Sequence, residues 1–233
     1  MLVVGMNDSR QDSRLAWGLL ARRTCVLPTW RGWFALLVVG VALGAALVMS
    51  VHPFLAVTDP LPGGLLVVEG WASDASMRQV VEEFSHNRYD AVVVTGGPLE
   101  KGSSFARFKT YAEFGAATLA QLGMPTNTLH AVPAPAVRQD RTYASALALK
   151  RWLRERNVKP SHLNIMTVGV HARRTRMMFA AAFREELKIG IVAIDELGFD
   201  PERWWTSSAG FRVVVDEVVA YVYASLFFWP GKQ

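Results

Sequence analysis

Short apolar runs recur between residues 64 and 194, and they predict β-strands. They do not alternate polar with apolar residues, which is the pattern of strands buried on both faces of a sheet. Five runs fit: 65–68, 91–94, 129–132, 164–168 and 189–194. The run 129–132 is the weakest of them.

The stretches between these runs have helical periodicity. Apolar or small residues are spaced i, i+3, i+4, i+7 from Met77 to Phe84 and again from Thr175 to Ala182. Further helices are predicted over 104–122 and 141–154, and Asp200 followed by Pro201 favours a helix start. Alternating strands and helices predict an α/β fold: an open, Rossmann-like parallel sheet of about five strands with helices on both faces.

One transmembrane helix is predicted to precede this domain. Residues 32–58 contain no formal charge, and 33–51 alone would span roughly 28 Å as a helix, about the thickness of a bilayer core. Trp30, Trp33 and Phe34 cluster at its start, where aromatic rings favour the headgroup layer. The predicted parts are a basic tail (1–31), an anchor with its juxtamembrane segment (32–57), a linker (58–63) and the α/β domain (64–233).

Arginines before the anchor set its expected orientation. Residues 1–31 hold five Arg and two Asp, so the tail is expected in the cytoplasm and the domain outside the plasma membrane of a bacterium, its inner membrane. The alternative is a cleaved secretory signal, but the basic region is long and the apolar run exceeds the usual 7–15 residues. Gly40 and Gly44 form a GxxxG spacing that would allow two anchors to pair as a homodimer.

Composition and charge narrow the function classes. The chain has 25 Lys+Arg against 20 Asp+Glu, and most of the excess lies before residue 32, so nucleic acid is not an expected partner. Its single cysteine excludes a disulfide framework and a Cys-rich metal site. No metal and no cofactor is predicted by any motif.

The last predicted helix, 211–228, ends in an uncharged stretch that is too short to cross a bilayer. Two interpretations stand: a core helix that covers the sheet, or a helix lying partly in the headgroup layer of the adjacent membrane. Trp204 and Trp205 just before it would either pack in the core or cover a sugar or base.

Polar residues follow the predicted strands, where ligands bind in open parallel sheets. They are Glu69, Gly96, Gly97, Asp140, Arg141, Thr142 and the segment 171–176. The glycines are expected to allow positive φ and close approach of a ligand to the backbone. Glu69 is either a ligand-binding group or a structural anchor, and Asp140 and Thr142 either bind ligand or cap their helix.

The segment 171–176 is the densest cluster, with His171, Arg173, Arg174 and Arg176 in the first turns of a helix. Cations fit poorly with the positive amino end of a helix, so this arrangement favours a bound anion there. His171 and Arg174 share one face and are the predicted catalytic pair, while Arg173 and Arg176 share the next face. A solvated basic face is the alternative.

These residues resemble the ElyC/SanA/YdcF family over about residues 63–228. The resemblance is carried by the anchor, the strand followed by Gly96-Gly97, the helix start at Thr142, and the H-x-x-R of His171 and Arg174. It implies an α/β protein concerned with the bacterial cell envelope, a ligand site at these five residues, and S-adenosylmethionine as one ligand reported in the family. The usual T-x-E-N-A pattern here reads T-Y-A-S-A from Thr142, so its carboxylate and amide are absent.

Together the sequence predicts a membrane-anchored extracytoplasmic domain that binds an anionic small molecule, phosphorylated or linked to a lipid or sugar, in envelope or exopolysaccharide biogenesis. If it is an enzyme, transfer or hydrolysis at phosphate is expected, with His171 as general acid or base and Arg173 and Arg174 neutralising charge. The alternatives are a non-catalytic scaffold of envelope assembly and a domain that binds S-adenosylmethionine or a nucleotide.

Overall fold

A computed structural model describes residues 14–15, 20–21, 26–99, 107–184 and 186–230. The chain divides into two compact units, residues 1–45 and 46–233. The predicted cytoplasmic tail, 1–31, lies mostly outside the described residues. Its described part includes two short antiparallel strands, β1 (Arg14–Leu15) and β2 (Leu20–Ala21).

The predicted membrane helix is present as α1 (Trp30–Leu55), two residues earlier at each end than expected. It is long and apolar enough to cross a membrane. Its side chains are exposed along most of its length, and Leu55 is its only buried residue. Gly40 and Gly44 leave open space where a Cβ would stand, so pairing through the GxxxG spacing stays a prediction.

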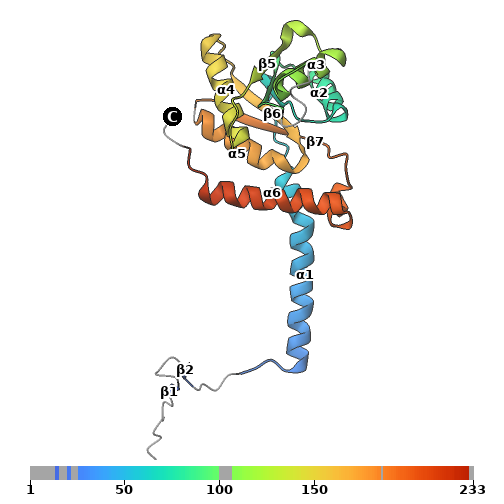
Figure 1. Cartoon of the computed structure of the whole chain (residues 1–233). Coiled ribbons are helices and arrows are strands. Elements are labelled where there is room, and N and C mark those ends of the chain that lie inside the picture. The colour runs from blue at the N-terminus through green and yellow to red at the C-terminus, as the bar shows by residue number, and fades with distance from the viewer. Residues whose placement is uncertain (1–13, 16–19, 22–25, 100–106, 185, 231–233) are drawn as a thin grey trace, which may run out of the picture. The chain divides into compact units, whose positions relative to one another are not determined.

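The second unit contains the predicted parallel sheet, with all five expected strands (Figure 1). They are β3 (Leu65–Glu69), β4 (Ala91–Gly96), β5 (Leu129–Pro133), β6 (His162–Val168) and β7 (Lys188–Ile194). Their order across the sheet is β5-β4-β3-β6-β7, and every neighbouring pair is parallel. From β3, the chain adds strands first on one side (β4, β5) and then on the other (β6, β7), so the strand order reverses between β3 and β6. Ligands of such sheets bind at this topological switch point.

Helices pack on both faces of this sheet, as predicted. Leu65, Val67 and Ile165 face a cluster that includes residues of α4 (Arg141–Glu155) and α5 (Ala172–Phe183). Leu66, Val68 and Met166 face residues of α2 (Asp74–His86) and α3 (Tyr111–Gln121). Consecutive side chains of a strand point to opposite faces, so unbroken apolar runs supply both layers of core.

Helix α3 begins later than the predicted 104–122, although 104–106 lie outside the described residues. Residues 107–110 are not helical, because Thr110 and Glu113 form a reciprocal capping box that starts the helix at Tyr111. The predicted start at Asp200 is confirmed: its side chain accepts the Glu202 N–H at 3.0 Å, although the turns that follow form the 3₁₀ helix η3 (Pro201–Thr206).

The last helix, α6 (Ser208–Phe227), does not cover the sheet. Its inner side packs in a separate cluster with Leu55 at the end of α1, with Val170 in the 3₁₀ turn η2 (Gly169–His171), and with Trp204. Trp204 is buried and its indole N–H donates to the Val48 carbonyl at 3.2 Å. Packing therefore accounts for Trp204.

The predicted linker, 58–63, is hydrogen-bonded to the sheet. Asp59 and Ile191 exchange backbone hydrogen bonds of 2.7 and 3.1 Å. The side chain of the fully buried Asn164 accepts from the Leu61 N–H and donates to the Leu61 and Gly63 carbonyls. The segment is thus fixed against β6 and β7.

Candidate functional site

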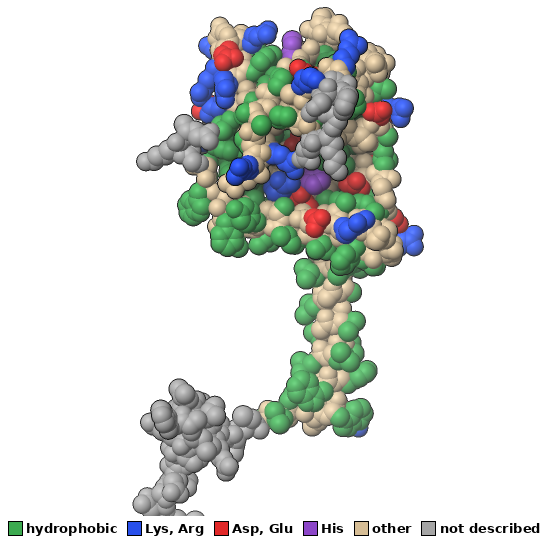
Figure 2. Space-filling model, in the orientation of Figure 1, with side chains coloured by type: hydrophobic (Ala, Val, Ile, Leu, Met, Phe, Trp, Pro, Cys, Tyr) green, Lys and Arg blue, Asp and Glu red, His purple; other side chains and the backbone are tan. Residues whose placement is uncertain are grey.

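A cavity of about 1110 Å³ opens at the carboxyl ends of the strands. Strands β3 and β4, the segment after β5, the starts of α3, α4 and α5, and one side of α6 line it. Figure 2 shows a hollow beside α6 in which blue, purple and red side chains gather. The switch point of the sheet therefore coincides with a pocket large enough for a metabolite, since such sites measure roughly 300–1,000 Å³.

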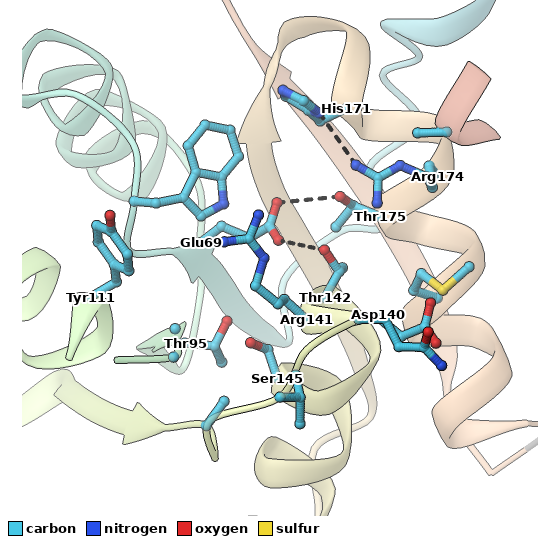
Figure 3. Close-up of a pocket in the computed structure, with 18 of the residues that line it drawn as sticks. Glu69, Thr95, Tyr111, Asp140, Arg141, Thr142, Ser145, His171, Arg174 and Thr175 are labelled. Carbon is cyan, nitrogen blue, oxygen red and sulfur yellow. Dashed lines mark hydrogen bonds between the residues drawn. The ribbon is translucent and has the colours of Figure 1, made fainter. Parts of the chain in front are cut away.

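Glu69, the last residue of β3, forms the floor of this cavity. It is only 5% exposed and its carboxylate accepts hydrogen bonds from three threonine hydroxyls, of which Figure 3 shows those of Thr142 and Thr175. The Thr175 hydroxyl donates to Glu69 Oε2 at 3.2 Å, and the Thr142 hydroxyl donates to Oε1 at 3.4 Å. The Thr167 hydroxyl also donates to Oε2. These bonds offset the cost of burying a charged group and tie β3 to β6, α4 and α5.

A second buried carboxylate, Glu217 of α6, holds both residues of the predicted catalytic pair. It is 2% exposed. Its Oε1 lies 2.6 Å from Arg174 Nε and its Oε2 3.0 Å from Arg174 Nη2, a two-point contact with the guanidinium. Oε2 also lies 2.6 Å from His171 Nδ1.

This contact sets the charge states. Burial raises the pKa of Glu217, but hydrogen bonds and positive charge from His171 and Arg174 outweigh it, so the pKa lies below its ordinary value. Burial by itself lowers the pKa of Arg174. The contact with Glu217 and the negative charges of Glu69 and Asp140 outweigh burial, so the pKa of Arg174 lies above its ordinary value. Both groups are therefore ionised at neutral pH.

An ionised carboxylate only accepts hydrogen bonds, so Nδ1 of His171 carries the proton. The contact of Arg174 Nη2 with the same nitrogen is long, at 3.5 Å. Within the described part of the chain, no group is hydrogen-bonded to Nε2 of His171. The His171 ring packs against Trp71 in a T-shaped arrangement. The two ring centroids lie 5.1 Å apart and the ring planes make an angle of 86°. Glu217 thus orients the His171 ring.

Two helix starts at the cavity lack side-chain caps. The starts of α2, α3 and α6 are capped by Ser73, Thr110 and Ser207. In contrast, no side chain caps α4 or α5. The capping interpretation of Asp140 is wrong, because it adopts φ 56° and ψ 40° and its carboxylate makes no cap bond. The first N–H groups of α4 therefore contribute positive potential beside Arg141.

The predicted role of Gly96 and Gly97 needs correction. Neither has positive φ. A Cβ on Gly96 would stand 2.7 Å from the Tyr111 Cβ and 2.9 Å from the Ala112 nitrogen, so glycine there allows β4 to approach α3. A Cβ on Gly97 would lie 3.8 Å from the Pro135 carbonyl oxygen, an ordinary contact, and the Gly97 carbonyl accepts the Tyr111 N–H at 2.8 Å. Both residues still line the cavity.

The structure brings eight of the ten predicted site residues to the cavity: Glu69, Gly96, Gly97, Asp140, Arg141, Thr142, His171 and Arg174. It does not bring Arg173 and Arg176 there. Arg173 lies 4.0 Å over the Phe54 ring and donates to the Phe54 carbonyl, and Arg176 pairs with Asp59 at 2.9 Å. Helical rotation separates these two arginines from Arg174, so the basic cluster divides between the cavity and the junction with the linker.

Three important residues were not predicted: Glu217, Thr167 and Thr175. Thr175 had a usable signal, since it is the polar member of an otherwise apolar helical stripe. Glu217 had a weaker one, a carboxylate at the border of an uncharged helix. Asp216 and Arg138 also line the cavity. Among the described residues, no group of three or more His, Cys, Asp or Glu side chains is placed to hold a metal ion.

Comparisons with models of protein families, with curated proteins and with solved structures find no match.

Proposed function

We propose that the cavity binds an anionic, phosphate-bearing metabolite of cell-envelope or exopolysaccharide biogenesis. One observation carries this proposal: Arg138, Arg141, Arg174 and His171 meet the uncapped start of α4 at one cavity. Guanidinium groups and the N–H groups at the start of a helix are donors that phosphate prefers. The resemblance to ElyC/SanA/YdcF proteins belongs to the same proposal.

The carboxylates of the site favour a phosphorylated sugar or lipid-linked sugar over a bare polyanion. Glu217 is paired with Arg174 and His171, and Glu69 is held by hydroxyls, so neither is a free charge facing the ligand. Asp140 and Asp216 at the lining supply acceptors for sugar hydroxyls. A ligand with both phosphate and hydroxyl groups would match this mixture.

If the protein is an enzyme, its reaction is transfer or hydrolysis at phosphate. His171 would act through Nε2 as general acid or base, with Glu217 fixing the ring. Arg174 is rigidly held and would neutralise developing charge together with Arg141. Arg173, predicted to share this role, is engaged at Phe54 instead.

The location is part of the proposal: a single-pass protein of a bacterial inner membrane, its domain outside the cytoplasm. The length and apolar character of α1 and the arginines before it support this arrangement. The alternative of a nucleotide or S-adenosylmethionine ligand has support in the switch-point position of the cavity. An extracytoplasmic location argues against it, since that cofactor is made and used in the cytoplasm.

Exchange of one cavity arginine tests ligand binding. We expect Arg141→Gln to weaken binding of pyrophosphate and of a short isoprenyl pyrophosphate by roughly tenfold or more, because a charged hydrogen bond contributes about 1.5–3 kcal/mol. The full-length chain in lipid nanodiscs is titrated by calorimetry. Arg176→Gln is the matched control, since Arg176 pairs with Asp59 outside the cavity. Equal losses in both variants, or none in either, would contradict the proposal.

Substitution of His171 distinguishes the enzyme hypothesis from the scaffold hypothesis. We expect His171→Asn to abolish complementation of a deletion strain while the protein stays folded, because the amide can still donate to Glu217 but lacks Nε2. Thermal unfolding and membrane abundance verify that the variant is intact. Complementation at the wild-type level would instead favour the non-catalytic scaffold.

A further inference from the structure

The outer side of α6 is an exposed apolar surface. We call this set of side chains the outer face of α6: Val215, Val219, Val222, Tyr223, Leu226 and Phe227. Val219, Leu226 and Phe227 are each 63% exposed, and Trp229 just beyond the helix is 84% exposed. Figure 2 shows green side chains gathered along this helix. Contiguous apolar surface of this kind marks an interaction site in a folded protein.

The composition of this segment suits a lipid headgroup layer. From Val218 to Pro230 no residue carries a charge. Tyr223, Phe227 and Trp229 supply aromatic rings, which favour the membrane–water interface. The inner side of the same helix is covered: Val214 and Val218 pack in the cluster with Leu55, and Glu217 is held by Arg174 and His171. The outer face is left exposed by the described part of the chain, and the exposed Arg212 and Asp216 lie near its start.

The end of α1 provides the link to a membrane. Within the second unit, Val48, Val51 and Leu55 pack in one cluster with Val214, Val218 and Tyr221 of α6. Phe54 meets the Tyr221 ring edge-on at 5.5 Å. The part of α1 that precedes these contacts, Trp30–Leu47, is about 18 residues or ~27 Å long, close to the thickness of a bilayer core. These contacts hold α6 beside the last turns of α1, residues 48–55, within the second unit.

We propose that α6 is an interfacial helix whose outer face inserts into the headgroup layer of the bilayer that α1 crosses. The contacts with α1 hold α6 within reach of that layer, and the uncharged outer face gains by leaving water. No other segment of the described chain covers this face.

This placement has a consequence for the cavity. Val219 and Tyr223 belong to the outer face and also line the cavity, so its mouth would face the lipid headgroups. A lipid-linked phosphate could then enter without leaving the membrane surface. This consequence rests on the proposed function, whereas the membrane contact of α6 does not.

Depth-dependent fluorescence quenching tests the membrane contact. In the full-length chain with Cys25→Ser, single cysteines replace Leu226 on the outer face, Leu43 within α1, or the exposed Arg151 on α4. Each variant is labelled with an environment-sensitive dye and placed in phosphatidylcholine nanodiscs, with or without lipids brominated near the headgroup. Because Leu43 and Leu226 are exposed, labels there do not disturb the core.

We expect brominated lipid to cause loss of fluorescence at position 226, and emission there to shift to shorter wavelength, while the label at 151 is unaffected. A label at 226 that behaves like the one at 151 overturns the proposal. So does a shielded label at 226 that lipid does not quench, together with a disulfide-linked dimer of the unlabelled Leu226→Cys variant on oxidation, which identifies another copy as the partner. An unquenched label at 43 in deeper-brominated lipid overturns the premise that α1 spans the bilayer.

The same discs separate this inference from the proposed function. Pyrophosphate binding that Arg141→Gln weakens, together with an unquenched position 226, would remove the membrane contact and leave the ligand site. A label at position 226 that lipid quenches, in a protein that binds neither pyrophosphate nor isoprenyl pyrophosphate, would support the membrane contact and contradict the proposed ligand site.

Discussion

Replacing Glu217 with alanine is expected to destabilise the protein by about 3–5 kcal/mol, since removing one partner of a buried ion pair leaves the other uncompensated. Arg174 would lose both of its contacts with Glu217, and His171 the acceptor of its Nδ1 proton. The measurement is urea unfolding of the detergent-solubilised chain at pH 7. Asp216→Ala is the matched control: a neighbouring but exposed carboxylate, expected to change the free energy of unfolding by about 0.5 kcal/mol or less.

The effect of this substitution should depend on pH. The pKa of Glu217 in the folded protein lies below its ordinary value of 4.5, so the unfolded chain takes up a proton first as the pH falls. The stabilisation by Glu217 is therefore complete above pH 4.5 and is lost as the pH falls through the lower, folded pKa. We expect the difference between wild type and Glu217→Ala to be constant near neutral pH and to narrow in acid. A difference that grows in acid would contradict the assignment of an ionised Glu217.

The sheet was predictable because its signal is local. The run Leu65-Leu66-Val67-Val68 is buried at every position, and only a strand covered on both faces requires that of consecutive residues. The edge strand β5 was the weakest prediction for the same reason: only Val132 of its five residues is buried. An edge strand with few buried residues needs fewer apolar side chains, so its apolar pattern in the sequence is weaker.

The candidate site was predictable only as far as strand ends could show it. Parallel strands put Glu69, Gly96 and His171 at one edge of the sheet, and helical spacing joined His171 to Arg174. Glu217 comes from a helix 43 residues after Arg174, and nothing local indicates which side of that helix faces the cavity. Tertiary packing decided that, and it also placed Arg173 against Phe54.

The boundary between anchor and domain could not be read from hydropathy, because one continuous helix serves both. The first part of α1, residues 30–47, is as apolar as the turns that follow it. Even so, Leu43 is 66% exposed and Leu55 only 1% exposed. The second unit begins at Ala46, within α1, whereas the domain was predicted to begin at residue 64. A chain shortened to residues 60–233 would lose Leu55, the Trp204 hydrogen-bond acceptor at Val48 and the Asp59–Ile191 bridge, so ligand binding is best measured on the full chain.

Two leucines of α1 allow this boundary to be tested with the same substitution. We expect Leu55→Ala to destabilise the domain by about 2–5 kcal/mol, since Leu55 fills the cluster with Val170, Trp204 and Val214 and its removal leaves a cavity. Leu43→Ala should change the free energy of unfolding by about 0.5 kcal/mol or less, because Leu43 is 66% exposed. Urea unfolding in detergent, followed by tryptophan fluorescence, measures both. Equal effects of the two substitutions would mean that α1 ends outside the domain and serves only as an anchor.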